Sequence, residues 1–201
     1  MFSDEENSSE SERSSFVSEG YNTLKTSRLA ENTEIFMENL LDTLIAKAKS
    51  AIIPEEYDFF GKLVGSWDFD FYDRKNSQTV AGEWHFAWVL EGAAIQDVFI
   101  LPSRPVRAEG RSPYEEYGTT LRVYNPSTTA WDIVYCCEGE VTQFEARREE
   151  NKIVLTALQD ENTKWVFAEI TDDTFHWQNV TVKKDGTWNV TVDIYATRKD
   201  G

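Results

Sequence analysis

The sequence has few of the residues on which metal sites and many enzymes depend. Its 201 residues include two histidines and two cysteines, and no Cys/His group has the spacing of a zinc site. It holds no Gly-rich phosphate loop and no Gly-x-Ser-x-Gly nucleophile motif. These absences argue against metal-dependent, nucleotide-dependent and serine-hydrolase chemistry, and no metal site is expected.

Basic residues are also scarce, since 20 Lys and Arg stand against 36 Asp and Glu, for a formal net charge of −16. Nucleic acids and anionic membranes require positive surfaces, so neither is an expected partner. No apolar run approaches a membrane span, and the N-terminus lacks the apolar core of a signal peptide. Cys136 and Cys137 are adjacent in a predicted strand and face opposite ways, so no disulfide is expected. These features predict an acidic cytoplasmic protein; they carry no signal for its oligomeric state.

Three segments differ in composition. Residues 1–30 are rich in Ser and Glu and predict a disordered acidic tail. Residues 31–53 predict an amphipathic helix, with helical periodicity over 32–50 that aligns Ile35, Phe36, Leu40, Leu44 and Ala48. Packing against the rest of the protein is the favoured use of this stripe, and binding a partner is the alternative. A second short helix, predicted from Pro54, is apolar enough to plug a barrel.

Residues 54–201 predict one β domain rich in aromatic residues, of which the whole chain has 7 Trp, 8 Tyr and 12 Phe. From Val64 the hydrophobic period becomes two, and turn signals separate ten predicted strands. They lie near 65–73, 79–90, 93–101, 116–124, 130–138, 140–148, 151–158, 163–170, 173–182 and 187–198. Because no crossover helix separates them, we expect an all-β, antiparallel, up-and-down barrel with room for a ligand. The long loop 102–115 is typical of a lid or a disordered flap.

Alternation along the strands predicts which side chains face inward. Trp67 and Arg198 lie on the first and last strands, which are neighbours in a closed barrel, and we expect them to stack at its floor. The Glu91-Gly92 turn pairs Trp84 with Phe99, Phe86 with Asp97, and Trp88 with Ile95, all inside. Likewise, the Asp185-Gly186 turn pairs Trp177 with Ile194, Asn179 with Val192, and Thr181 with Val190.

One register stays open at the sequence level. If Tyr124 and Trp131 share a face, Arg122 looks inward and is the natural partner of Asp97. A shift by one residue would instead place Arg122 opposite Asp132 on the outer surface.

The sequence resembles the calycin superfamily, which includes lipocalins and fatty-acid-binding proteins. The matching features are a short helix, Gly65-Ser66-Trp67 on the first strand and Arg198 on the last strand. Segments 82–92, 94–98 and 117–124 are similar to a bacterial family of uncharacterised calycin-like proteins. The likeness covers about residues 55–198. It implies a barrel whose closed end is sealed by the Trp and the Arg, and it implies no activity.

The leading hypothesis is that the barrel binds a small, largely apolar molecule. The candidate ligand-binding residues are Trp84, Phe86, Trp88, Asp97, Phe99, Arg122, Tyr124, Trp131, Trp177 and Asn179. An isomerase or cyclase, with Asp97 moving a proton, is the alternative. A third hypothesis is an interaction protein that works through its N-terminal helix. No cofactor is expected, because a haem iron would need His85 or His176 as ligand and both are predicted to face outward.

Overall fold

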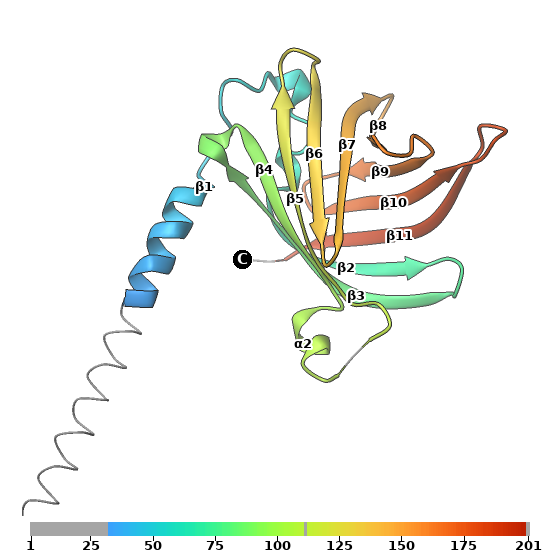
Figure 1. Ribbon diagram of the computed structural model, residues 1–201, viewed down its shortest axis with the longest axis horizontal. Helices are drawn as coiled ribbons and strands as arrows, with labels where there is room; N and C mark the ends of the chain where they lie inside the picture. The colour runs from blue at the N-terminus through green and yellow to red at the C-terminus, as the bar shows by residue number, and fades with distance from the viewer. Residues whose placement is uncertain (1–31, 111, 200–201) are drawn as a thin grey trace, which may run out of the picture. The chain divides into compact units, whose positions relative to one another are not determined.

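The computed structural model describes residues 32–110 and 112–199; the predicted acidic tail lies outside them. A closed barrel of ten antiparallel strands dominates the molecule (Figure 1). The ten strands are β2 (Gly65–Asp73), β3 (Gln78–Val89), β4 (Ala94–Leu101), β5 (Glu116–Asn125), β6 (Ala130–Cys137), β7 (Glu140–Glu149), β8 (Lys152–Ala157), β9 (Thr163–Ile170), β10 (Thr174–Val182) and β11 (Trp188–Arg198). The all-β, up-and-down prediction is confirmed, and each strand bound lies within two residues of its predicted position.

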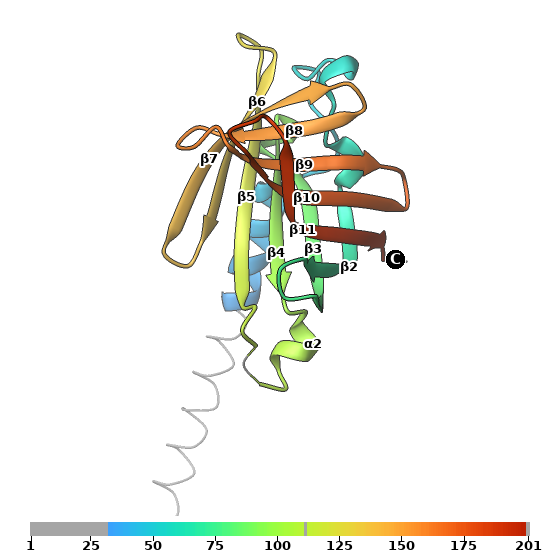
Figure 2. The ribbon, with the colours of Figure 1, turned by 90° about the vertical axis from the view of Figure 1, so that its right-hand side faces the viewer.

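Closure of the barrel follows from strand pairing. Each strand pairs with its sequence neighbours, and β11 returns to pair with β2. An additional two-residue strand, β1 (Ile45–Ala46), pairs with the end of β3. Figures 1 and 2 both show β4–β6 running steeply across β9–β11.

One end of the barrel is plugged by two short 3-10 helices, η1 (Glu55–Tyr57) and η2 (Gly61–Leu63), where one short helix is predicted. Phe60 and Leu63 are fully buried, and the Phe60 ring lies 5.2 Å edge-on from the Trp131 indole. Trp131 Nε1 donates a hydrogen bond to the carbonyl of Tyr57. Apolar side chains and indole hydrogen bonds therefore hold the plug in the barrel.

The predicted floor contact is confirmed at the same end. Trp67 and Arg198 are direct cross-strand partners, and the guanidinium carbon of Arg198 lies 4.1 Å from the centroid of the Trp67 ring. The guanidinium also donates to the carbonyls of Lys62, Val64 and Asp172. Arg198 thus ties the plug to the strands that close the barrel.

The predicted β10–β11 register is right in part. Trp177 pairs with Ile194 and Asn179 with Val192, but a β-bulge follows Asn179. The hairpin turn is one residue longer than predicted, because the Lys183 N–H bonds to Thr187, and the bulge restores the register beyond it. The predicted inward pair of Thr181 and Val190 is therefore wrong: Thr181 is exposed, and Val190 packs on a small outer apolar cluster around Val180.

The N-terminal helix spans residues 32–44, so it is shorter than the predicted segment 31–53 and than the helical periodicity over 32–50. Ile45 and Ala46 leave the helix because they pair with Val89 and Trp88. The large apolar side chains of the helix are 38–64% exposed. None of the described helices is long and apolar enough to cross a membrane.

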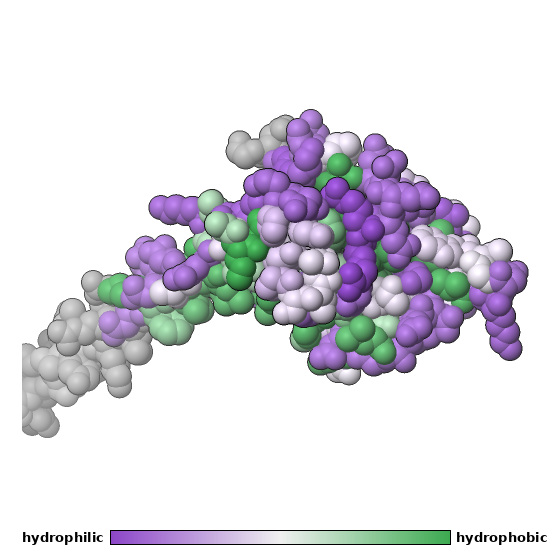
Figure 3. Space-filling model, turned by 90° about the horizontal axis from the view of Figure 1, so that it is seen from above, coloured by the Kyte–Doolittle hydropathy of each residue, from purple (hydrophilic) through white to green (hydrophobic). Residues whose placement is uncertain are grey.

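The loop 102–115 is anchored at both ends. It contains α2 (Arg104–Arg107), whose Arg104 forms an ion pair with buried Glu83. Near its other end, the hydroxyl of Tyr114 donates to Asp73. The face of the molecule seen in Figure 3 is mostly hydrophilic, as is typical when the other face of each strand lines a core.

Candidate functional site

The interior of the barrel is layered from the plugged end to the open end. Beside the plug lies an ion pair between Arg122 and Asp97, both 1% exposed. Arg122 therefore faces inward, which decides the register left open by the sequence: Tyr124 pairs with Trp131. The guanidinium lies 5.3 Å from the centroid of the Phe60 ring and 5.4 Å from that of Phe86. It is thus enclosed by an aromatic ring on either side and a carboxylate.

Asp97 is held by two donors. One carboxylate oxygen accepts the Arg122 guanidinium, and the other accepts the backbone N–H of Thr120 at 3.0 Å. Burial raises the pKa of Asp97, and the Arg122 charge opposes that shift. Neither Asp97 nor Arg122 is among the residues that line the cavity described next. The pair is therefore part of the packed half of the barrel.

A cavity of about 510 Å³ occupies the other half, within the range of small-molecule sites. Phe and Trp side chains form much of its wall: Phe71, Trp84, Phe99, Phe144, Trp165 and Trp177. The deep walls are buried, whereas Val141, Gln159 and Asp160 are exposed at the mouth. The mouth therefore lies between the β6–β7 turn and the β8–β9 loop, at the end of the barrel opposite the plug.

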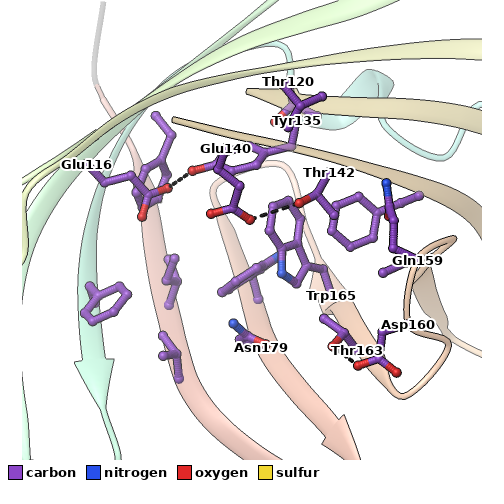
Figure 4. Close-up of a pocket in the computed structure, with 18 of the residues that line it drawn as sticks. Glu116, Thr120, Tyr135, Glu140, Thr142, Gln159, Asp160, Thr163, Trp165 and Asn179 are labelled. Carbon is purple, nitrogen blue, oxygen red and sulfur yellow. Dashed lines mark hydrogen bonds between the residues drawn. The ribbon is translucent and has the colours of Figure 1, made fainter. Parts of the chain in front are cut away.

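Polar groups from several elements also line this cavity (Figure 4). The Tyr135 hydroxyl donates to Glu116, and the Thr142 hydroxyl donates to Glu140 at 2.9 Å. Three carboxylates in all reach the cavity, from β5, from β7 and from the β8–β9 loop, where Asp160 accepts the Thr163 hydroxyl at 2.9 Å. No Lys, Arg or His is among the described residues that line it. The cavity therefore combines aromatic walls with negative charge.

The carboxylates differ in their electrostatic setting. Burial raises the pKa of Glu116, and the neighbouring Glu140 and Asp97 charges raise it further. By contrast, hydrogen bonds from Thr163 and Asn162 lower the pKa of Asp160. An ionised Asp160 thus stands at the mouth, and a carboxyl that ionises with more difficulty lies deeper.

Some polar side chains that line the cavity have no hydrogen-bond partner in the described part of the chain, and the buried indole N–H groups of Trp84 and Trp177 are among them. Trp177 is 7% exposed and its indole N–H makes no hydrogen bond. The side-chain amide of Asn179 likewise makes none with the described residues, although its backbone carbonyl accepts the Thr191 hydroxyl. A buried N–H without an acceptor is unfavourable, so a ligand that offers an acceptor would be stabilised here.

The structure separates the sequence-predicted site residues into two groups. Trp84, Phe99, Trp177 and Asn179 line the cavity. The others lie outside its lining, in the barrel's packed core: Phe86, Trp88, Asp97, Arg122, Tyr124 and Trp131. Alternation gives the face of a residue but not its depth along the barrel, and the plug fills the half in which this second group lies.

Several cavity residues were missed by the sequence reasoning. Glu116 lies an even number of positions from inward-facing Arg122 on the same strand, so the two share a face. The same holds for Tyr135 with Trp131 and for Glu140 with Phe144. The parity rule applied to these middle strands would therefore have found all three cavity residues. Gly118 adds a further signal, because a Cβ at this position would lie 2.8 Å from the Tyr135 ring. The glycine lets that ring lie across β5 toward Glu116. Asp160 lies in a loop, where parity gives no information.

Both histidines lie on the outer face. His85 Nδ1 is 2.9 Å from the Ser66 hydroxyl, and His176 Nε2 is 2.8 Å from a carboxylate oxygen of buried Asp193. Neither lines the cavity, so neither is placed to ligate a haem iron inside the barrel. The described residues hold no group of three or more His, Cys, Asp or Glu side chains arranged for a metal ion.

Comparisons with known proteins add little to this geometry. No protein-family model and no curated protein sequence matches the chain. Among solved structures, the crystal structure of Rv2717c from M. tuberculosis is similar, with 10% sequence identity and a TM-score of 0.45. The match covers 74% of this chain and 99% of that one. It says nothing about what this chain binds.

Proposed function

We propose that this protein is a calycin-like barrel that binds a small, largely apolar molecule in the cavity between the β6–β7 turn and the β8–β9 loop. The observation that carries the proposal is the cavity itself. Side chains of the strands and the plug fill the plugged half of the interior, whereas a barrel of ten strands is wide enough to leave space in the other half. The remaining 510 Å³ is bounded by aromatic side chains, which provide the apolar burial that drives small-molecule binding.

Binding is favoured over catalysis by the position of the acid that the enzyme hypothesis requires. Asp97 is ion-paired with Arg122 and is not among the residues that line the cavity, so it is not placed to exchange a proton directly with a molecule held there. The cavity offers hydrogen-bonding groups and carboxylates, and no Ser, Cys, Lys or His is among the described residues that line it. Free Cys136 and Cys137 support a reducing, cytoplasmic setting for this role.

A neutral solvatochromic dye such as Nile red tests the proposal. We expect saturable 1:1 binding with a blue-shifted emission, because the aromatic walls exclude water from the dye. Thr163→Trp, which adds an indole to the cavity wall, should abolish binding. Thr79→Trp is the matched control, because Thr79 is exposed on β3 and does not line the cavity.

Thermal unfolding of both variants shows whether they are folded. Equal dye binding by the folded Thr163→Trp and Thr79→Trp variants would place the dye elsewhere and refute the proposal. Absence of saturable binding to the wild-type protein would also count against it.

A further inference from the structure

The cavity has a charge asymmetry that an apolar ligand alone does not explain. Glu116, Glu140 and Asp160 reach it from three separate elements, and no described basic side chain lines it. None of the three carboxylates forms an ion pair with a described residue. Their hydrogen-bond donors are hydroxyls and neutral amides, such as Tyr135 on Glu116. The negative charge of the cavity is therefore left without a counter-charge.

Acidic side chains that are buried elsewhere in the fold form ion pairs with basic side chains. Glu83 is 3% exposed and contacts Arg104 and Lys199. Asp193 is fully buried on the outer face and is bonded by Arg74 and His176. Asp97 has Arg122. The three buried acids among the described residues are thus each paired with a base, as the cost of burying a charge requires, whereas the half-buried Glu116 of the cavity has none.

The aromatic walls of the cavity, like its carboxylates, favour a positively charged ligand. The face of an indole or phenyl ring carries partial negative charge and attracts ammonium groups. Trp165 is half-buried among the cavity residues, with its ring centroid 5.6 Å from that of Trp177 and 4.3 Å from that of Phe144. Indoles combined with unpaired carboxylates form the arrangement by which proteins recognise organic cations.

We propose that the natural ligand is an organic cation: an amine or quaternary ammonium group on an apolar, aromatic or alkyl body. The body occupies the space between Trp84, Phe99 and Trp177, and the cationic group lies toward Glu116, Glu140 and Trp165. Exposed Glu140 and Asp160 at the mouth attract the cation from solution, whereas half-buried Glu116 holds it. The unpartnered indole N–H of Trp177 and the amide of Asn179 accommodate an acceptor on the same molecule. This inference rests on the proposed binding function.

Three probes of matched size test the charge preference: 1-naphthylmethylammonium, 1-naphthalenemethanol and 1-naphthoate. Binding is measured by quenching of tryptophan fluorescence at low salt. We expect the ammonium to bind about 10-fold or more tighter than the alcohol, which corresponds to one cation–π contact and a partly screened ion pair. The naphthoate should bind most weakly. The preference for the ammonium should fall as salt is raised from 50 to 300 mM, because screening weakens the exposed carboxylates.

The variant E116Q/E140Q tests whether the preference for the ammonium comes from these two carboxylates or from the net negative charge of the whole protein. Gln at 116 retains the acceptor for Tyr135 and suits a position where burial disfavours the charged form. We expect this variant to bind the ammonium no more tightly than the alcohol, with the affinity for the alcohol unchanged. The control, E149Q/E169Q, makes the same change in net charge at exposed positions outside the cavity, and should keep the preference.

The outcomes distinguish the two proposals. If the alcohol binds and the ammonium binds no tighter, the cation inference is wrong and the binding function stands. If E116Q/E140Q keeps the full preference for the ammonium, Glu116 and Glu140 are not its cause and the inference also fails. If none of the three probes binds, the proposed function itself is contradicted for ligands of this size.

Discussion

Removal of Arg122 is the perturbation whose effect follows most directly from the structure. Arg122→Met keeps much of the side-chain volume between Phe60 and Phe86 and deletes the charge. Asp97 is then left in the core with one donor, the backbone N–H of Thr120. Breaking a fully buried ion pair from one side typically costs about 3–5 kcal/mol, and both side chains here are 0–1% exposed. We therefore expect Arg122→Met to lower the free energy of unfolding by about 3–5 kcal/mol at pH 8.

The loss should depend on pH and on Asp97. Burial already raises the pKa of Asp97 above its usual value, and loss of the guanidinium raises it further. Ionised Asp97 therefore destabilises the variant at high pH, and the loss shrinks as the pH falls and the carboxyl is protonated, by about 1.4 kcal/mol per pH unit while it titrates. In Arg122→Met, the second change Asp97→Asn removes the charge and keeps an acceptor for Thr120, so it should recover about half of the loss or more.

Urea unfolding followed by far-UV circular dichroism measures these effects. With a slope of about 2 kcal/mol per M, Arg122→Met should lower the midpoint by about 1.5–2.5 M at pH 8 and by less at pH 5. A loss below about 1 kcal/mol at pH 8 would refute the assignment of this pair as a buried, mutually dependent unit. So would a double variant that is no more stable than Arg122→Met.

Three further predictions concern stability and are checked by the same urea titration. Gly82→Ala should cost about 1–3 kcal/mol, because the new Cβ would lie 2.1 Å from the Phe69 ring; an unchanged midpoint would contradict that contact. The pKa of Glu83 is lowered to about 2, chiefly by the hydrogen bond from Arg104. The ionised Glu83 therefore contributes about 1–2 kcal/mol to the free energy of unfolding, after allowance for the exposed Arg104; this contribution is present above pH 4.5 and is lost as the pH falls toward 2. Glu83→Gln should make the free energy of unfolding less dependent on pH in this range, and an equally steep acid transition in the variant would contradict this assignment. Arg198→Met should cost about 2–4 kcal/mol, because three backbone carbonyls lose a charged donor at the closed end; a cost below 1 kcal/mol would show that the plug is held without it.

The strands and the floor of the barrel could be predicted from the sequence because they depend on local signals. Period-two alternation and turn residues located all ten strands, and the Glu91-Gly92 turn gave the correct β3–β4 register. In β10–β11 the register beyond the bulge came out right only because the longer turn and the bulge compensate each other. No local pattern indicates a bulge of this kind, since it depends on how neighbouring strands pack.

The candidate site was less accessible to sequence reasoning because depth along a barrel is a tertiary property. Asp97 was expected inside and is inside, and Arg122, whose register the sequence left open, is inside as well, yet the plug around Phe60 takes that half of the interior. The acids of the cavity, such as Glu116, alternate with apolar residues in ordinary strands and resemble solvent-facing charges in the sequence. Only the closure of the barrel places them around one space.

Native mass spectrometry with 1-naphthylmethylamine tests the central claim, that the cavity holds a small molecule, most directly. The wild-type protein should take up one probe molecule, and the folded Thr163→Trp variant should take up none, because its indole occupies the same space. Equal uptake by both proteins, or no uptake by the wild-type protein, would contradict the claim.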